Sequence, residues 1–278
     1  MKEMDEITGL LACPRCRGVF TSASQALICS ICGLSYPIAD QRIFFVSPPS
    51  DAPRSHTSTD PRGWSAWRRA NFEYFRRELA AEPKDGVLVD LGTGASQFRS
   101  LTDRFRLLVG VDFYPYERAV VVADISKPLP FRDQCCDIIF LSNVLDHLSH
   151  PRECLAECRR ILRPGGRIVG TVAFLLHVNQ MPYDFFRYTG FGLERMLAEA
   201  GFTAIRVEPL GAPADVYRTV QRHFFHLLFA SSLASWARFA SRGAWAATRM
   251  LDVLLAPISR RIPPSSVYTE GYGFSALC

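Results

Sequence analysis

The stretch Val87–Ser96, V-L-V-D-L-G-T-G-A-S, decides how this chain folds. Its first residues are mostly apolar and strand-forming, and they lead directly into a glycine-rich turn. Glycine is needed where the backbone bends sharply or where a ligand approaches it closely, because glycine carries no Cβ. Asp90, Gly92 and Gly94 occupy this turn. The stretch therefore predicts a buried strand that ends in a loop for a nucleotide-like cofactor.

Apolar, strand-like segments alternate with helical segments through the rest of the chain after residue 64. This alternation is typical of a parallel sheet that helices cover on both faces. In such sheets the ligand lies beyond the carboxyl ends of the strands, where the glycine loop would sit. Strands are expected at 86–90, 107–112, 120–123, 136–142, 166–173, 204–209 and 271–277, and helices at 64–82, 151–162 and 192–200. We predict an α/β fold with a doubly wound, mostly parallel, seven-stranded sheet.

The composition limits the size and the setting of the protein. A chain of 278 residues can form one large and one small domain. With 32 Lys and Arg against 27 Asp and Glu, the charge does not require a nucleic-acid partner. The first residues lack the pattern of a signal peptide, and nine cysteines then fit a reducing compartment. We expect a cytoplasmic protein, with the membrane surface as an alternative location.

Two C-x-x-C pairs, Cys13 with Cys16 and Cys29 with Cys32, stand twelve residues apart. Four thiolates from two tight turns are the ligands of a tetrahedral structural Zn²⁺, which then has no position left for water or substrate. The alternative, four thiols buried as small apolar side chains, is less favoured. A ribbon of this size would depend on its metal to fold.

The ribbon also resembles a known module. L-L-A-C-P-x-C at 10–16 and C-x-x-C-G-L-x-Y-P-I-A-D at 29–40 are similar to the zinc ribbon of the small activator subunit shared by several RNA and protein methyltransferases. We therefore divide the chain into a ribbon at 1–47, a linker at 48–63 that is rich in Pro, Ser, Thr and Asp, and a large domain at 64–278.

Five ordered motifs of the large domain resemble those of class I S-adenosylmethionine-dependent methyltransferases. They are V-L-V-D-L-G-T-G at 87–94, V-G-V-D at 109–112, A-D-I-S-K-P-L-P-F at 123–131, C-D-I-I-F-L-S-N-V-L-D-H-L at 136–148 and I-L-R-P-G-G-R-I-V-G-T-V at 161–172. The resemblance implies a Rossmann-like methyltransferase fold. A dinucleotide site is disfavoured, because the third glycine of that fingerprint would fall at Gln97.

The resemblance also implies roles for particular residues. Asp90, Gly92 and Gly94 would hold the amino acid part of S-adenosylmethionine, and Asp112 the ribose. The adenine would lie beside Asp124 and Ile125, and the methyl group beside Ser142 and Asn143. From the residues alone, Asp112 also fits an ordinary strand-end turn, and Asp124 also fits a helix N-cap. Ser96 departs from the family, which usually has a third glycine there.

The acceptor side offers three candidate bases, His147, His177 and Asp184, because a hydroxyl acceptor benefits from proton removal. The segment 182–189, P-Y-D-F-F-R-Y-T, resembles a P-x-D-F-x-R-Y-T segment of bacterial methyltransferases met in cell-envelope glycan or secondary-metabolite pathways. Many relatives have a histidine shortly before this proline, where Asn179 stands here. Asp184 and Arg187 also fit a structural ion pair.

Residues 211–266 form an insertion before the last strand, with seven arginines against two acids. Its apolar clusters predict a pair of amphipathic helices. Its longest uncharged run is shorter than the roughly 20 residues that a spanning helix needs. We therefore expect peripheral membrane contact through 211–264 or a lid over a lipid-like substrate. Packing on the core, or on the second subunit of a homodimer, is an equal alternative.

Together these features predict an S-adenosylmethionine-dependent methyltransferase. We expect O-methylation of a small-molecule, secondary-metabolite or cell-envelope glycan or lipid-linked acceptor. One alternative is an rRNA or tRNA methyltransferase, since an N-terminal zinc module also precedes this domain in a bacterial rRNA guanine methyltransferase family. The ribbon, however, lacks interleaved basic and aromatic residues. A second alternative is a non-catalytic, methyltransferase-like binding or activator protein.

Overall fold

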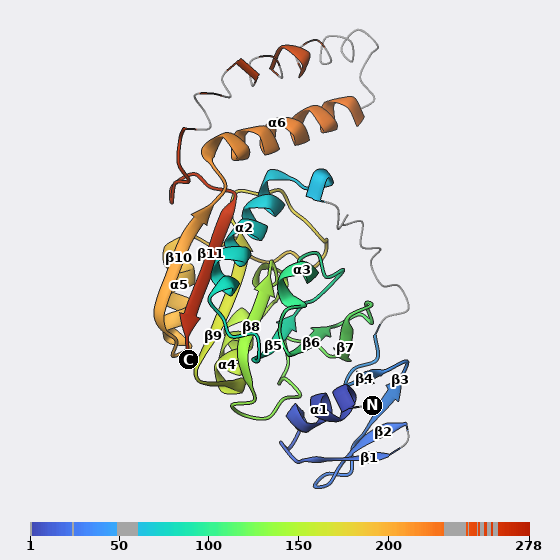
Figure 1. Cartoon of the computed structure of the whole chain (residues 1–278). Helices are drawn as coiled ribbons and strands as arrows, with labels where there is room; N and C mark the ends of the chain where they lie inside the picture. The colour runs from blue at the N-terminus through green and yellow to red at the C-terminus, as the bar shows by residue number, and fades with distance from the viewer. Residues whose placement is uncertain are drawn as a thin grey trace.

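The computed structural model (Figure 1) describes residues 2–23, 25–48, 61–230 and 261–278, together with 243, 245–248, 250, 253, 254 and 257. Its described strands form one sheet in the order β1-β2-β3-β4-β7-β6-β5-β8-β9-β11-β10. The seven strands from β7 to β10 in this order confirm the predicted seven-stranded sheet. They are β5 (Val87–Leu91), β6 (Leu107–Asp112), β7 (Ala119–Val122), β8 (Cys136–Ser142), β9 (Leu162–Ala173), β10 (Thr203–Leu210) and β11 (Gly271–Leu277).

Strands β7, β6, β5, β8 and β9 are parallel, whereas β11 runs antiparallel to both β9 and β10. Every residue of β5 is buried, which is what an apolar strand in the middle of a two-sided sheet requires. The sheet is therefore mostly parallel, as predicted, and its central strands end at one common edge.

Helices cover both faces of this sheet (Figure 1). On one face, Tyr74, Phe75 and Leu79 of α2 (Ala66–Ala80) pack into a core with strand residues such as Leu88, and α3 (Arg99–Thr102) lies on the same side. On the other face, α4 (Pro151–Ile161) and α5 (Gly190–Glu199) bury their apolar residues in a second, larger core. This arrangement confirms the doubly wound fold.

The N-terminal ribbon continues the large sheet. It contains α1 (Lys2–Leu10), β1 (Phe20–Ala23), β2 (Ala26–Cys29), β3 (Ser35–Ala39) and β4 (Arg42–Phe44). Strand β4 pairs with β7 in parallel, with Ile43 opposite Val121 and Phe44 opposite Val122. Ile7 and Leu11 are buried in the larger core. The sequence indicated a separate small module, and the backbone hydrogen bonds of β4 join it to the sheet. The boundaries at 47 and 63 stay predictions.

Helix α6 (Pro213–Ala230) forms the first part of the predicted insertion, which confirms its helical character there. It lies beyond the end of the sheet at which the parallel strands terminate (Figure 1). Most of 231–260, and the linker up to residue 60 apart from 48, lie outside the described residues, and η1 (Pro61–Gly63) is a short 3₁₀ turn. Among the helices that the structure describes, none combines the length and the apolar character needed to cross a bilayer.

Candidate active site and metal centre

The glycine loop after β5 adopts a backbone that requires glycine. Gly92 has a φ of 76°, and a Cβ there would lie 2.6 Å from Cγ2 of Val144. Gly94 has a φ of 48°, and an added Cβ would meet only the Gly92 carbonyl oxygen, at 3.9 Å. The backbone of Gly94 therefore faces open space that a ligand can approach. Ser96 has a φ of 53°, the left-handed conformation that glycine adopts without strain.

Two carboxyl groups lie at the ends of neighbouring strands beside this loop. Asp90 is buried, and its Oδ2 accepts a hydrogen bond of 2.8 Å from the Thr93 hydroxyl. Burial raises the pKa of Asp90 to about 7. Asp112 accepts hydrogen bonds from the Gly94 amide at 2.9 Å and the Tyr114 amide at 3.0 Å, and burial raises its pKa as well. The structure thus brings Asp90, Gly94 and Asp112 to one edge of the sheet, and their contact with S-adenosylmethionine stays a prediction.

Asp124 is engaged in its own turn. Its Oδ1 accepts hydrogen bonds from the Ser126 amide at 2.9 Å and the Ser126 hydroxyl at 2.6 Å. Asp124 therefore resembles the helix N-cap that the sequence left open as an alternative, except that a turn and not a helix follows it. Ile125 is buried beside it. Their contact with adenine stays a prediction.

Ser142 ends β8, and Asn143 follows it with a φ of 54°. The Asn143 amide nitrogen Nδ2 donates to Oδ1 of Asn71 at 3.3 Å, while its Oδ1 is buried without a hydrogen-bond partner among the described residues. An unpaired buried oxygen is costly, so this atom fits a ligand that donates a hydrogen bond. Asn71, on α2, was not predicted. The sequence signal that could have found it is its spacing, because Asn71 is four residues from both Trp67 and Phe75 and lies on the same helix face as these aromatic residues.

On the predicted acceptor side, the candidate bases His147 and Asp184 lie together with Asp146, which was not predicted. One nitrogen or oxygen atom from each of the three side chains lies within 4.8 Å of the others. Nδ1 of His147 is 2.6 Å from the Tyr183 carbonyl oxygen, and its Nε2 is 3.6 Å from Oδ2 of Asp146. Burial raises the pKa of Asp146. The His147 side chain is 14% exposed, so a small group can reach it.

Asp184 forms the ion pair that the sequence offered as an alternative to a catalytic role. Its Oδ2 accepts from Nη2 of Arg187 at 2.7 Å and from the Asn179 amide at 2.5 Å. The Arg187 guanidinium lowers the pKa of Asp184 to about 2. A carboxylate with so low a pKa is a weak base, which favours a positioning role.

The side chain of His177 contacts different residues from those that His147 contacts. Its ring packs against that of His223 on α6, with centroids 3.9 Å apart. Burial lowers the pKa of His177. Its role as a base stays a prediction, and the contact shows that the loop containing His177 and the insertion meet.

The four ribbon cysteines converge as predicted, with their sulfur atoms all within 4.8 Å of one another. The Cys13–Cys32 and Cys16–Cys29 sulfurs lie 3.7 and 3.4 Å apart. Sulfurs bound to one tetrahedral Zn²⁺ are about 3.8 Å apart, so the cluster fits a structural zinc. The backbone amide of Cys32 lowers the pKa of Cys29 to about 6, which favours the thiolate. None of the nine cysteines, all within the described part of the chain, is in a disulfide.

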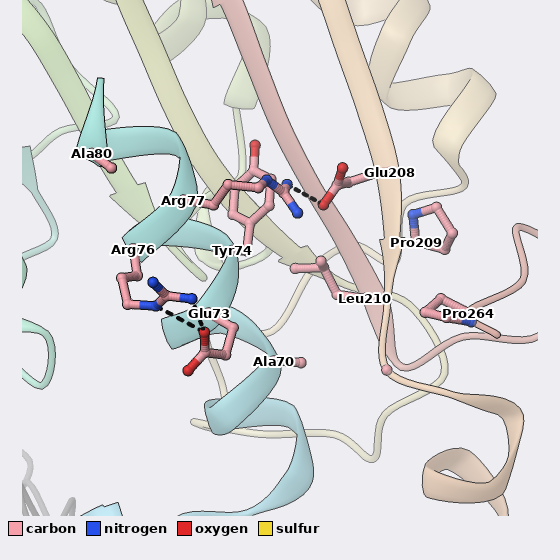
Figure 2. Close-up of a pocket in the computed structure, with 11 residues that line it drawn as sticks. Ala70, Glu73, Tyr74, Arg76, Arg77, Ala80, Glu208, Pro209, Leu210 and Pro264 are labelled. Carbon is pink, nitrogen blue, oxygen red and sulfur yellow. Dashed lines mark hydrogen bonds and ion pairs between the residues drawn. The ribbon is translucent and has the colours of Figure 1, made fainter. Parts of the chain in front are cut away.

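A groove of about 500 Å³ lies elsewhere, between α2 and β10 (Figure 2). Its charged side chains pair with one another, Arg76 with Glu73 and Arg77 with Glu208. None of the predicted site residues lines it. The groove is therefore separate from the candidate active site.

The parallel sheet, its antiparallel β11 and the glycine loop after β5 define a Rossmann-like methyltransferase fold. Residues 89–170 match the family model described as a methyltransferase domain, and residues 6–40 match the model described as Trm112p-like protein. The chain therefore joins a segment similar to methyltransferase domains to a Trm112p-like segment.

Individual relatives also match parts of the chain. An uncharacterized methyltransferase of Mycolicibacterium paratuberculosis is 36% identical over 95 residues, which cover 30% of this chain and 37% of that protein. An uncharacterized protein of Methanocaldococcus jannaschii is 24% identical over 116 residues, covering 38% of this chain and 55% of that protein. The chain thus spans about half or less of the curated relatives it matches. A solved S-adenosylmethionine-dependent methyltransferase from Archaeoglobus fulgidus superposes with a TM-score of 0.48 at 18% identity, covering 76% of this chain and 94% of that one.

Proposed function

We propose that this protein is an S-adenosylmethionine-dependent methyltransferase. The observation that carries the proposal is the open Gly94 backbone between Asp90 and Asp112, at the carboxyl ends of β5 and β6 within the matched methyltransferase domain. Bound S-adenosylmethionine supplies a methyl group that its sulfonium already activates, so positioning of the acceptor provides much of the acceleration.

The residues present fit this cofactor. Each oxygen of Asp112 accepts one backbone hydrogen bond and keeps further lone pairs, so the carboxylate can also accept bonds from two ribose hydroxyls. Asp90 lies beside the loop, where the ammonium of the amino acid part would stabilise its ionised form. The unpaired Oδ1 of Asn143 is a further acceptor at the end of β8.

We propose an amphipathic acceptor, either a small molecule or a lipid-linked glycan. Apolar side chains are exposed on the loop that contains Asp184, including Met181 at 80% and Tyr183 at 57%. Helix α6 also exposes a stripe at helical spacing, formed by Tyr217, Val220, Phe224 and Leu227. An exposed apolar stripe in an arginine-rich insertion supports peripheral contact with a membrane that carries anionic lipid. The homodimer remains the alternative use of this stripe.

An RNA methyltransferase is the second candidate. The Trm112p-like match over residues 6–40 favours it, because the similar activator subunit serves RNA and protein methyltransferases. A non-catalytic activator is the third, and the intact Asp90, Gly94 and Asp112 arrangement argues against it.

Isothermal titration with S-adenosylmethionine tests the enzyme proposal. We expect the wild-type chain to bind and Asp112→Ala to bind at least tenfold more weakly, with the exposed Asp85→Ala as the matched control. Absence of binding by the folded wild-type protein contradicts the proposal.

Two further assays separate the acceptors. Transfer of a labelled methyl group to rRNA or tRNA, but not to lipid-linked glycans, selects the second candidate. Co-sedimentation with vesicles containing phosphatidylglycerol tests the α6 stripe, and we expect Phe224→Ser combined with Leu227→Ser to lose it. Equal sedimentation of this variant argues against membrane contact through α6.

A further inference from the structure

We infer that Asp146, His147 and Asp184 form a binding site for a divalent transition-metal cation, separate from the ribbon zinc. The inference concerns the acceptor side of the proposed active site, but binding of the cation does not depend on the proposed methyl transfer. Three ligating atoms, one from each side chain, lie within 4.8 Å of one another. All three side chains are mostly buried, with exposed fractions of 5%, 14% and 3%.

The hydrogen bond of His147 determines which of its nitrogens faces the cluster. A carbonyl oxygen only accepts, so Nδ1, at 2.6 Å from the Tyr183 oxygen, must carry a proton. In the neutral ring Nε2 then has a lone pair, and it points toward Oδ2 of Asp146. A metal-binding histidine typically donates its other N–H to a backbone carbonyl or carboxylate in this way.

Asp146 has an unused ligand atom. Its Oδ1 is buried and has no hydrogen-bond partner among the described residues. A carboxyl group removed from water in this way either keeps its proton or gains a positive partner. Arg187 forms its ion pair with Asp184, so the carboxyl group of Asp146 remains available to a cation.

A protonated His147 is the competing explanation. An N–H to oxygen hydrogen bond spans about 2.7–3.2 Å, whereas Nε2 and Oδ2 of Asp146 are 3.6 Å apart. Ligand atoms about 2.1 Å from one ion are about 3.0–3.5 Å apart, and the 3.6 Å between Nε2 and Oδ2 lies close to this range. The spacing therefore favours a cation over a shared proton.

The donor set indicates the kind of cation. One imidazole and two carboxylates suit Mn²⁺, Fe²⁺, Co²⁺ or Zn²⁺, and three protein ligands leave positions open for oxygen atoms of an acceptor. Asp184 keeps a lone pair on Oδ1 beyond its bond to Arg187, so it can contribute one ligand. With a cation bound, His147 acts as a ligand and no longer removes the acceptor proton.

Titration of the zinc-loaded full chain with Mn²⁺, followed by the electron paramagnetic resonance signal of free Mn²⁺, tests the inference. Mn²⁺ prefers oxygen and nitrogen and does not displace zinc from four thiolates. We expect one Mn²⁺ per chain, and at least tenfold weaker binding to Asp146→Asn. Asp85→Asn, an exposed aspartate changed in the same way, is expected to bind as the wild type does.

No Mn²⁺ binding by the wild-type chain overturns the inference, and so does equal binding by Asp146→Asn. If Asp146→Asn does not fold, His147→Gln, which retains both carboxylates, provides the same comparison. Isothermal titration with S-adenosylmethionine runs in parallel. A protein that binds S-adenosylmethionine but no Mn²⁺ refutes the cation site alone.

Discussion

Asp90→Asn is expected to change how the stability of this protein depends on pH. Asp90 is buried behind the glycine loop, and burial raises its pKa from 3.8 to about 7. The folded protein therefore holds this proton to a higher pH than the unfolded chain does. Stability is lost as the pH rises from the unfolded pKa toward the folded one. Once both states are ionised, the loss is about 4 kcal/mol.

Part of this loss of stability occurs at pH values where unfolding is easily measured. Between about pH 6 and about pH 8 the wild-type protein loses about 1.4 kcal/mol through Asp90. Asparagine has nearly the same shape, accepts the Thr93 hydrogen bond and does not titrate. The melting temperature of Asp90→Asn relative to wild type should therefore rise by about 3 to 5 °C over this interval.

Thermal unfolding followed by circular dichroism, in buffers without cofactor, measures the difference. Groups with shifted pKa values that do not interact with Asp90, such as Glu270, are present in both proteins and cancel. The exposed Asp85→Asn should follow the wild-type pH dependence. Parallel curves for wild type and Asp90→Asn would show that burial does not hold the Asp90 proton, and the reasoning would be wrong.

Three further outcomes follow from other sites. Gly110→Ala should lower the free energy of unfolding by about 1–3 kcal/mol, because its Cβ would lie 2.1 Å from the Arg118 carbonyl oxygen. Gly9→Ala is the control, since a Cβ there has no atom within 4 Å and should leave stability unchanged. Thermal unfolding of both variants measures the difference. Chelation should release one Zn²⁺ per chain and unfold the ribbon, and Cys29→Ser should prevent zinc uptake, as a colorimetric zinc assay would show. Ser96→Gly should be neutral or stabilising by up to about 1 kcal/mol in urea unfolding, because its φ of 53° is left-handed, and a clear destabilisation would contradict this.

Local patterns predicted the large domain closely. The bounds of β6, β8 and β11 agree with the sequence prediction, because each strand is a short apolar run between turn residues. Strand β9 begins at Leu162, four residues earlier than expected, since Cys136 pairs with Leu162 before the Pro-Gly-Gly turn. A pair between residues this far apart in the chain cannot be predicted from the sequence next to either residue.

The candidate site was predicted less evenly. Asp112 accepts a hydrogen bond from the glycine loop that follows Asp90, because both aspartates lie at the ends of neighbouring parallel strands and such ends share one edge. Asn71 was missed, because its contact with Asn143 joins a helix to a strand end 72 residues later. The sequence also left two uses of Asp184 open, and the position of Arg187 supports the ion pair.

The sequence by itself determined the strands, the glycine loop and the paired cysteines, because periodicity, turn chemistry and ligand spacing act over a few residues. Only the tertiary structure decided that β4 adds the ribbon to the sheet at β7, and that Asp146, His147 and Asp184 converge. The first depends on a strand edge that becomes available only once the sheet has formed. The second depends on side chains that meet only after distant segments have packed. The free energy of that packing comes from burial across the whole core, which no single motif contains.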